Sequence, residues 1–303
     1  MRFNLIGPFQ IVDGDGRILP TGSPKVSQVL AVLLAHSGDP VTPDTLIREL
    51  WQHNPPRSAL NTVQTYVHHA RRLLALPDAR PDARPDTRPN AGPDTRPDTG
   101  PDAGRPVLST HFGGYTMHVD DRAVDIKVFE QLVARGKEEF RAGRCEAAAG
   151  ALGAALGLWR GPVLLDVPKG SVLAGRIVHL EEVRIRALEL RIEALQLLGR
   201  LRELIPELRT LVHDYPFNEW FHGRLITALH QAGRRAEALE AYRSVRRLLR
   251  DELGLEPSPD IQRLHERILR PPRGPAESAT ALGGAPATPA PARTPAGRPG
   301  RSG

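Results

Sequence analysis

Residues 57–74 carry side chains of the types that read bases in double-stranded DNA. Asn and Gln can pair with adenine through two hydrogen bonds, Arg can do so with guanine, and Thr can touch the thymine methyl group. No acidic residue lies between Glu49 and Asp78, whereas a merely solvated helix commonly pairs Glu with Lys. This composition favours contact with the major groove. The candidate base-reading residues are Asn61, Thr62, Gln64, Thr65, His68, His69 and Arg72.

Cations near these residues are candidates for holding phosphates. The candidates are Lys25, Arg57 and Arg71. The formal net charge of the whole sequence is only +6, so the local absence of acidic residues is more informative than the total. Contacts with phosphate give affinity that depends on salt and not on sequence, and they fix the register of a protein on the duplex.

Short strands and helices come before the base-reading segment. Residues 3–20 predict strands around an Asp-Gly-Asp-Gly turn, which is hairpin chemistry. Ser23 and Pro24 predict the start of a first helix, as N-cap and first-turn proline. Thr42 and Pro43 repeat this signal and predict a second, short helix.

A third helix is predicted from about Arg57 to Leu74. Its apolar residues follow one another at spacings of 3, 4, 3 and 4, which predicts one buried stripe. That stripe consists of Leu60, Val63, Val67, Ala70 and Leu74.

A second hairpin is predicted over residues 105–120, because glycines in its centre permit the positive φ of a tight turn. Its wing residues are His111, Gly113, Gly114 and Tyr115. Strands, three helices and a hairpin in this order are typical of a winged helix, whose last helix enters the major groove while the hairpin lies against the neighbouring backbone.

Two segments have the composition of disorder. Residues 77–104 are seven tetrads of the PDAR type, in which proline at every fourth position blocks a helix and no apolar side chain offers a core. We interpret this insert between the third helix and the wing as repeat slippage in a permissive loop. Replacing it by a short Gly/Ser turn is expected to leave DNA affinity nearly unchanged. Residues 271–303, rich in Pro, Ala and Gly, predict a disordered tail.

Residues 121–270 predict an all-helical region. Glycines before arginines at 143, 199 and 233 suit the C-terminal ends of helices, and the last two lie 34 residues apart, which is the tetratricopeptide period. Residues 172–198 are apolar on two sides, so this helix is expected to lie between neighbours. The fold class is therefore mainly α with a small β content.

Several function classes lack their motifs. The single cysteine, Cys145, excludes an intramolecular disulfide and a Cys-based metal site. The sequence has no P-loop, G-x-G-x-x-G or H-E-x-x-H motif, so we expect no enzymatic role, no catalytic residues, no cofactor and no metal. No apolar run approaches 18 residues and no signal peptide is evident, so we expect a cytoplasmic protein without a membrane partner.

A series of motifs then runs in order along residues 1–270. It comprises Leu5-Ile6-Gly7-Pro8, Pro24-Lys25 followed by QVLAVLLAH, LIRELW followed by PPRSALNTVQTYV, GGYTMHV, Val124-Asp125 with Phe129, LWRGP at 158–162 and AGRRAEALEAYRSVRRLLRDELGLEPSP at 232–259. In order and spacing this series resembles the Streptomyces antibiotic regulatory protein family.

The resemblance implies an OmpR-type winged-helix DNA-binding domain over residues 1–120, followed over residues 121–270 by a tetratricopeptide-like bacterial transcriptional activator domain. It implies an activator of a secondary-metabolite gene cluster that binds direct repeats near a promoter. It also implies contact with RNA polymerase through its σ or α subunit, and a homodimer or tandem pair on double-stranded DNA.

This chain departs from the family at two positions of the first and third helices. Ser27 and His69 stand where the family often has Arg, so each can weaken a phosphate contact or change which bases are read. Two other functions remain open from the residues alone: a repressor that uses the same DNA contacts, and a tetratricopeptide-like interaction scaffold.

Overall fold

The computed structural model describes residues 1–75, 106–111 and 113–270. The expected disorder of residues 77–104 and 271–303 therefore concerns positions outside the described residues. The contacts divide the chain into two compact units, Met1–Pro206 and Glu207–Gly303. These units are defined by contacts and do not test where one family domain ends and the next begins. The expected domain boundary between residues 120 and 121 therefore stays a prediction.

The chain begins with a three-stranded antiparallel sheet of β1 (Arg2–Asn4), β2 (Gln10–Val12) and β3 (Ile18–Leu19). The turn between β2 and β3 confirms the expected hairpin. In this turn the Asp13 carboxylate accepts hydrogen bonds from the backbone N–H groups of Asp15, at 2.9 Å, and Arg17, at 2.8 Å.

Three helices follow: α1 (Pro24–Ala35), α2 (Pro43–Trp51) and α3 (Ala59–Leu74). Thr42 caps α2 as expected, because its hydroxyl accepts a hydrogen bond from the Thr45 N–H at 3.2 Å. The expected cap at Ser23 is only half right. Helix α1 does begin at Pro24, but the Ser23 side chain makes no capping hydrogen bond, and proline alone presets the first helical φ.

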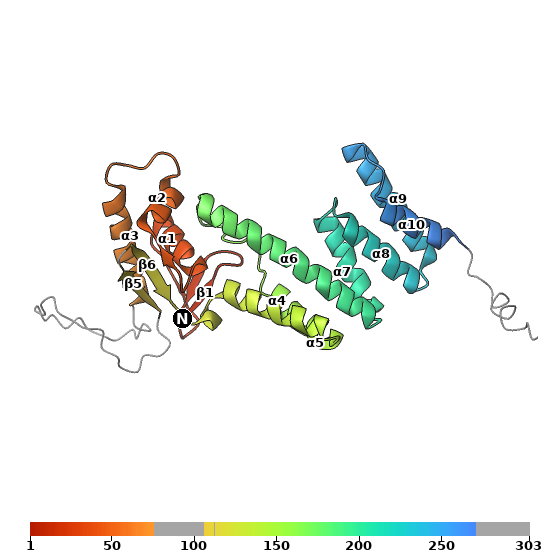
Figure 1. Cartoon of the computed structure of the whole chain (residues 1–303), viewed down its shortest axis with the longest axis horizontal. Coiled ribbons are helices and arrows are strands. Elements are labelled where there is room, and N and C mark those ends of the chain that lie inside the picture. The colour runs from red at the N-terminus through yellow and green to blue at the C-terminus, as the bar shows by residue number, and fades with distance from the viewer. Residues whose placement is uncertain (76–105, 112, 271–303) are drawn as a thin grey trace, which may run out of the picture. The chain divides into compact units, whose positions relative to one another are not determined.

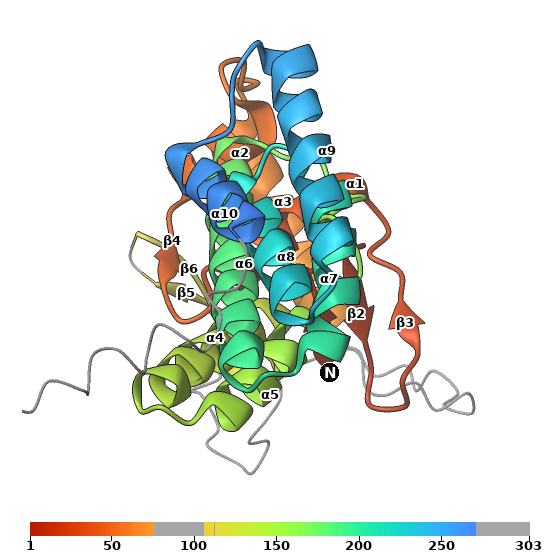
Figure 2. The ribbon, with the colours of Figure 1, turned by 90° about the vertical axis from the view of Figure 1, so that its right-hand side faces the viewer.

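A second sheet has the strand order β4-β6-β5 and contains the wing. Its strands are β4 (Pro40–Val41), β5 (Val107–His111) and β6 (Gly114–His118), which are labelled in Figure 2. Strand β4 was not predicted. Gly114 is required in this sheet because a Cβ atom there would lie 2.6 Å from the Val41 carbonyl oxygen. Gly113 provides the turn itself with a φ of +101°.

The first unit continues with η1 (Asp121–Ala123), α4 (Asp125–Arg141), α5 (Cys145–Leu156) and α6 (Ser171–Leu197). Helix α6 packs against α1, α2, α4 and α5, which confirms that it lies between neighbours. Figure 1 shows it alongside α4. Helix α1, buried from Val26 to Ala35, belongs to the same hydrophobic core as residues of α4 and α6.

Helix α7 (Leu201–Asp214) contains Pro206, the last residue of the first unit. The second unit continues with α8 (Glu219–Gln231), α9 (Arg235–Leu253) and α10 (Pro259–Leu269), which Figure 2 shows from the side. The expected glycine helix ends are confirmed, since Gly143, Gly199 and Gly233 all have positive φ between 68° and 74°.

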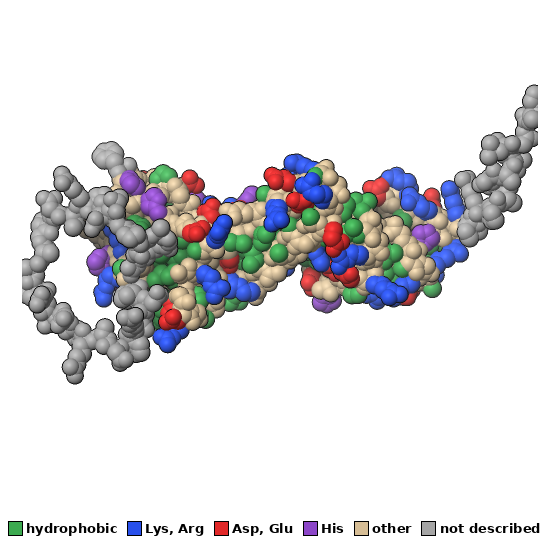
Figure 3. All heavy atoms as spheres, turned by 90° about the horizontal axis from the view of Figure 1, so that it is seen from below, with side chains coloured by type: hydrophobic (Ala, Val, Ile, Leu, Met, Phe, Trp, Pro, Cys, Tyr) green, Lys and Arg blue, Asp and Glu red, His purple; other side chains and the backbone are tan. Residues whose placement is uncertain are grey.

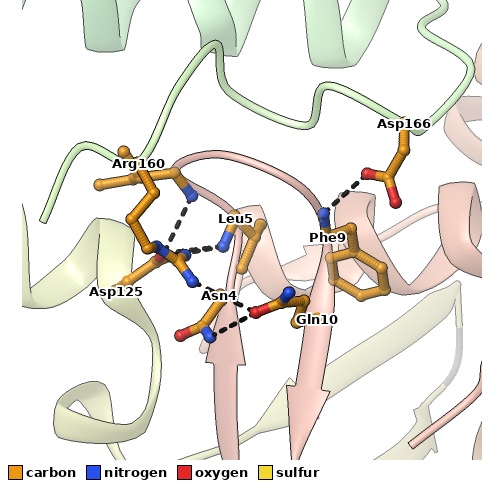
Figure 4. Close-up of polar contacts among 8 residues, drawn as sticks. Asn4, Leu5, Phe9, Gln10, Asp125, Arg160 and Asp166 are labelled. Atoms are coloured by element: carbon orange, nitrogen blue, oxygen red, sulfur yellow. Dashed lines mark hydrogen bonds and ion pairs between the residues drawn. The ribbon is translucent and has the colours of Figure 1, made fainter. Parts of the chain in front are cut away.

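Two aspartates tie the first sheet to the helical segment (Figure 4). The Asp125 carboxylate accepts hydrogen bonds from the N–H groups of Leu5, at 2.8 Å, and Ile6, at 2.9 Å. The Asp166 carboxylate accepts one from the Phe9 N–H at 2.7 Å. Burial raises the pKa of the Asp125 carboxyl, and these N–H donors, together with the Arg160 guanidinium at 2.9 Å, oppose that rise.

A third carboxylate joins α2 to α6. Glu49 is 1% exposed, and it accepts hydrogen bonds from the N–H groups of Gly170 at 2.6 Å, Val172 at 2.8 Å and Leu173 at 3.2 Å. These are the donors at the start of α6 that have no partner within the helix, so Glu49 acts as its cap. We call Glu49, Asp125 and Asp166 the polar joint. It holds the winged helix and α4–α6 together within the first unit.

Candidate nucleic-acid interface

Helix α3 turns one face to the core and the other to solvent. Its buried residues are Ala59, Val63, Val67, Ala70 and Leu74. Its exposed polar residues are Asn61, Gln64, Thr65, His68, His69 and Arg72. At about 100° per residue, Asn61, Thr65, His68 and Arg72 lie within about 40° of the direction opposite the core. These four residues are therefore the ones that a groove would meet first.

The two threonines of this helix already use their hydroxyl protons. Thr62 donates to the Ser58 carbonyl oxygen and Thr65 to the Asn61 carbonyl oxygen, each at 3.0 Å. Thr62 is also only half-exposed, at the edge of the face. What remains for a ligand is each methyl group and an acceptor lone pair, which suits contact with a thymine methyl group better than donation to a base.

The structure corrects the start of the third helix. The helix begins at Ala59, so Arg57 lies in the preceding turn. Leu60, expected in the buried stripe, is 48% exposed. It lies about 60° from the centre of the stripe on a helix of 3.6 residues per turn, and in the first turn Ala59 takes the buried position instead.

Two of the expected phosphate-binding cations are engaged within the protein. The Lys25 ammonium donates to the Leu50 carbonyl oxygen at 2.6 Å, near the end of α2. Arg71 donates through Nε to the Leu108 carbonyl oxygen at 3.0 Å and through a terminal nitrogen to the Thr110 hydroxyl. Arg71 thus connects α3 to strand β5 of the wing.

Arg57 and Arg72, in contrast, are not engaged by the described residues. The described residues provide neither of them with a hydrogen bond or an ion pair, and both are exposed. Their guanidinium groups are therefore available to an external anion.

The wing carries a pair of histidines that meet at one serine. The Ser109 hydroxyl lies 2.8 Å from Nε2 of His111 and 2.8 Å from Nε2 of His118. His118 was missed from the sequence, although alternation along the hairpin places it on the exposed side. Tyr115, expected among the wing residues, lies in β6 but is only 6% exposed and packs in the core. Figure 3 shows histidine side chains gathered at the winged-helix end of the chain.

A pocket of 370 Å³ opens beside α3. Its wall includes His69, Arg72 and Leu73 of α3, together with Thr21 and Val26. Ser27 lies beneath this surface, 7% exposed, with its hydroxyl 2.6 Å from that of Thr21. In this chain Ser27 is thus a buried polar residue, whereas His69 faces solvent.

Within residues 1–75, 106–111 and 113–270, no group of three His, Cys, Asp or Glu side chains is placed to hold a metal ion. Over these residues no helix combines the length and apolar character needed to cross a membrane.

Two family models match the sequence. Residues 124–269 match "Bacterial transcriptional activator domain" and residues 20–83 match "Transcriptional regulatory protein, C terminal". Together they cover α3 and the helical region that follows the wing.

Individual proteins are similar over most of the chain. Regulatory protein DnrI of Streptomyces peucetius is 34% identical over 270 residues, which are 89% of this chain and 92% of DnrI. Transcriptional regulator RedD of Streptomyces coelicolor is 32% identical over 89% of this chain and 70% of RedD. A solved structure of Mycobacterium tuberculosis EmbR, in complex with a low-affinity phosphopeptide, aligns with a TM-score of 0.74 at 33% identity. That alignment covers 92% of this chain and 68% of that one.

Proposed function

The chain belongs to the Streptomyces antibiotic regulatory protein family of DNA-binding transcriptional activators, and from that premise we propose how it binds DNA. In this proposal α3 enters the major groove of each of two direct repeats near a promoter. The wing lies against the adjacent backbone, and two protomers bind in tandem and recruit RNA polymerase through its σ or α subunit. The genes served are those of a secondary-metabolite cluster.

The observation that carries this proposal is the exposed, acid-free face of α3. Asn61 and Arg72 are the residue types that make two hydrogen bonds to adenine and guanine, and both face away from the core. His68 and Gln64 can reach neighbouring bases as donors or acceptors, while Thr65 offers its methyl group. His69 and Thr62 lie toward the edge of the face.

The phosphate contact is assigned to Arg57, a cation that has no partner among the described residues. Arg57 lies just before α3 and can hold a phosphate at the entrance to the groove. Arg71 has another role in this proposal: it fixes the wing, whose His111 and His118 then face the backbone. Lys25 stabilises the end of α2 and contributes its remaining positive charge.

The test begins with selection of genomic fragments by the purified protein, followed by footprinting of the best fragment. Two protected direct repeats upstream of a promoter are the expected result. A protected inverted repeat, or no enrichment above salt-sensitive background, would contradict the proposal.

Variants then separate base reading from phosphate binding. Asn61→Ala is expected to relax discrimination at one base pair by about 1–3 kcal/mol. Arg57→Gln is expected to weaken binding to all sequences alike and to reduce the slope of log K against log salt by about 1. Arg263→Gln, an exposed arginine on α10, is the matched control and should change neither quantity.

Recruitment of RNA polymerase is tested by transcription in vitro from the footprinted promoter. Added protein is expected to increase the number of full-length transcripts, and the increase should be lost when one repeat is scrambled. A decrease in transcripts would instead identify a repressor.

A further inference from the structure

Helix α9, in the second unit, presents four arginines on one face. Arg243, Arg246, Arg247 and Arg250 follow one another at spacings of 3, 1 and 3 residues, so they lie side by side over about two helical turns. We call these four residues the arginine patch. At about 1.5 Å per residue the patch extends about 10 Å along the helix.

One carboxylate serves the first pair of these arginines. Glu240 lies 3.4 Å from a terminal nitrogen of Arg243 and 3.1 Å from one of Arg247. Each of these two guanidinium groups is engaged through a single nitrogen, although a guanidinium has five N–H donors. Both arginines are well exposed, with side-chain accessibilities of 67% and 68%.

A second carboxylate serves the other pair. Glu256 is 2.7 Å from Arg246 and 2.7 Å from Arg250, and these two guanidinium groups lower the pKa of Glu256 to about 2. Four positive charges therefore face two negative ones, which leaves an excess of two.

The patch forms a wall of a pocket of 600 Å³. Tyr242 and His265 also line it, with their rings stacked in parallel at 3.8 Å between centroids. Burial lowers the pKa of His265, and the positive charges of Arg243 and Arg246 lower it further. Four arginines and one carboxylate line the pocket, so its wall carries a net positive charge.

We infer that the arginine patch docks an acidic segment of a partner protein. Guanidinium forks match carboxylates in geometry, and all four arginines already bind carboxylates within the chain. A segment of three extended residues, or two turns of a helix, spans the same distance of about 10 Å.

A nucleic-acid backbone fits this surface less well than an acidic segment does. Glu240 and Glu256 interrupt the row of positive charges along which successive phosphates would have to lie, whereas separate acidic side chains of a protein can be spaced to meet the arginines alone. Figure 3 shows acidic and basic side chains interspersed over the helical segments of the face that it draws. The inference does not depend on the DNA contacts proposed above, which involve residues of the first unit.

Fluorescence anisotropy of the full-length chain tests this inference, with a fluorescein-labelled octaglutamate peptide as the probe and an octaglutamine peptide as the uncharged control. The test variant is Arg243→Gln with Arg247→Gln. The matched control is Arg209→Gln with Arg234→Gln, which removes the same charge from two exposed arginines that share Glu237 in the same unit. Equal melting temperatures establish that both variants fold.

Octaglutamate is expected to bind the wild type more tightly at low salt than at high salt, and octaglutamine is not expected to bind. The test variant should bind octaglutamate at least about tenfold more weakly, while the control stays within about twofold. Equal losses in both variants would overturn the inference. So would a loss confined to an Arg57→Gln, Arg72→Gln variant, which would place the peptide on the DNA-binding face.

A labelled DNA duplex of unrelated sequence distinguishes the other class of ligand. If the Arg243→Gln, Arg247→Gln variant loses affinity for this duplex and not for octaglutamate, the patch is a surface for nucleic acid and the inference is wrong.

Discussion

Replacing Glu49 by glutamine is expected to weaken the first compact unit more than any exposed charge change can. The substitution keeps the shape of the side chain, so no cavity opens. It removes the negative charge and turns one acceptor oxygen into a donor that faces the N–H groups of Gly170, Val172 and Leu173. The start of α6 then has buried donors without partners.

The size of the effect follows from two contributions. A buried donor left unsatisfied costs about 1–3 kcal/mol. Loss of a negative charge at the N-terminus of a helix adds about 0.3–1 kcal/mol. Because the remaining amide oxygen still accepts at least one hydrogen bond, only one such donor is counted, and we expect a total loss of about 1–4 kcal/mol in the free energy of unfolding.

Urea denaturation followed by circular dichroism measures this difference. Glu146→Gln is the control, since Glu146 is 72% exposed and forms a surface ion pair with Arg200, which predicts a loss of about 0–1 kcal/mol. A loss for Glu49→Gln no larger than that of the control would contradict the capping role of Glu49. It would mean that Glu49 does not cap α6 in solution.

Three further outcomes are expected. Gly114→Ala should cost about 1–3 kcal/mol in thermal or urea unfolding, because its Cβ would press on the Val41 carbonyl oxygen, while Gly150→Ala, in a helix with open space around it, should cost nothing or stabilise slightly. Burial lowers the pKa of His222 in the folded protein, so the folded state keeps this ring neutral. The contribution of this ring to the free energy of unfolding should therefore be complete above a pH of about 6.5 and be lost as the pH is lowered. His222→Gln should make the free energy of unfolding, measured by urea denaturation at several pH values, fall less steeply as the pH is lowered. Equal pH dependence in the wild type and the variant would contradict the assignment. Arg71→Gln should speed amide exchange in the wing strands and lower affinity for all DNA sequences alike, and unchanged exchange would show that Arg71 does not hold the wing.

Elements with local signals were predicted from the sequence, and elements without them were not. Proline and threonine at helix starts located α1 and α2, and the three glycines with positive φ located helix ends. Strand β4 was missed because two residues, one of them Pro40, have no periodicity to detect. Leu60 was misplaced because the true start of α3 decides which residue of its first turn is covered.

The sequence predicted which residues of the candidate site are exposed better than it predicted what each of them contacts. The exposure of Asn61, His68 and Arg72 follows directly from the helical period. The engagement of Lys25 and Arg71 does not, because their acceptors are backbone carbonyl groups of other elements, which have no signature in a sequence. The phosphate contacts expected of Lys25 and Arg71 stay predictions, and so do the base contacts expected of α3.

The polar joint was invisible to sequence reasoning for the same reason. Glu49 and Gly170 are 121 residues apart, and nothing in the sequence distinguishes the three carboxylates of the joint from ordinary acidic residues. Their partners are N–H groups, which every residue except proline possesses. Only the packing of the first unit shows that these acids are structural.

The polar joint has a consequence for exchanging modules between regulators of this kind. A cut at residue 120 would separate the amides of Leu5, Ile6 and Phe9 from Asp125 and Asp166, and Glu49 from the helix that it caps. A chimera made there would inherit half of each contact from each parent. A crossover within α7, near the division at Pro206, transfers donors and acceptors together, so the DNA-binding specificity of one regulator is best moved with α4, α5 and α6 attached.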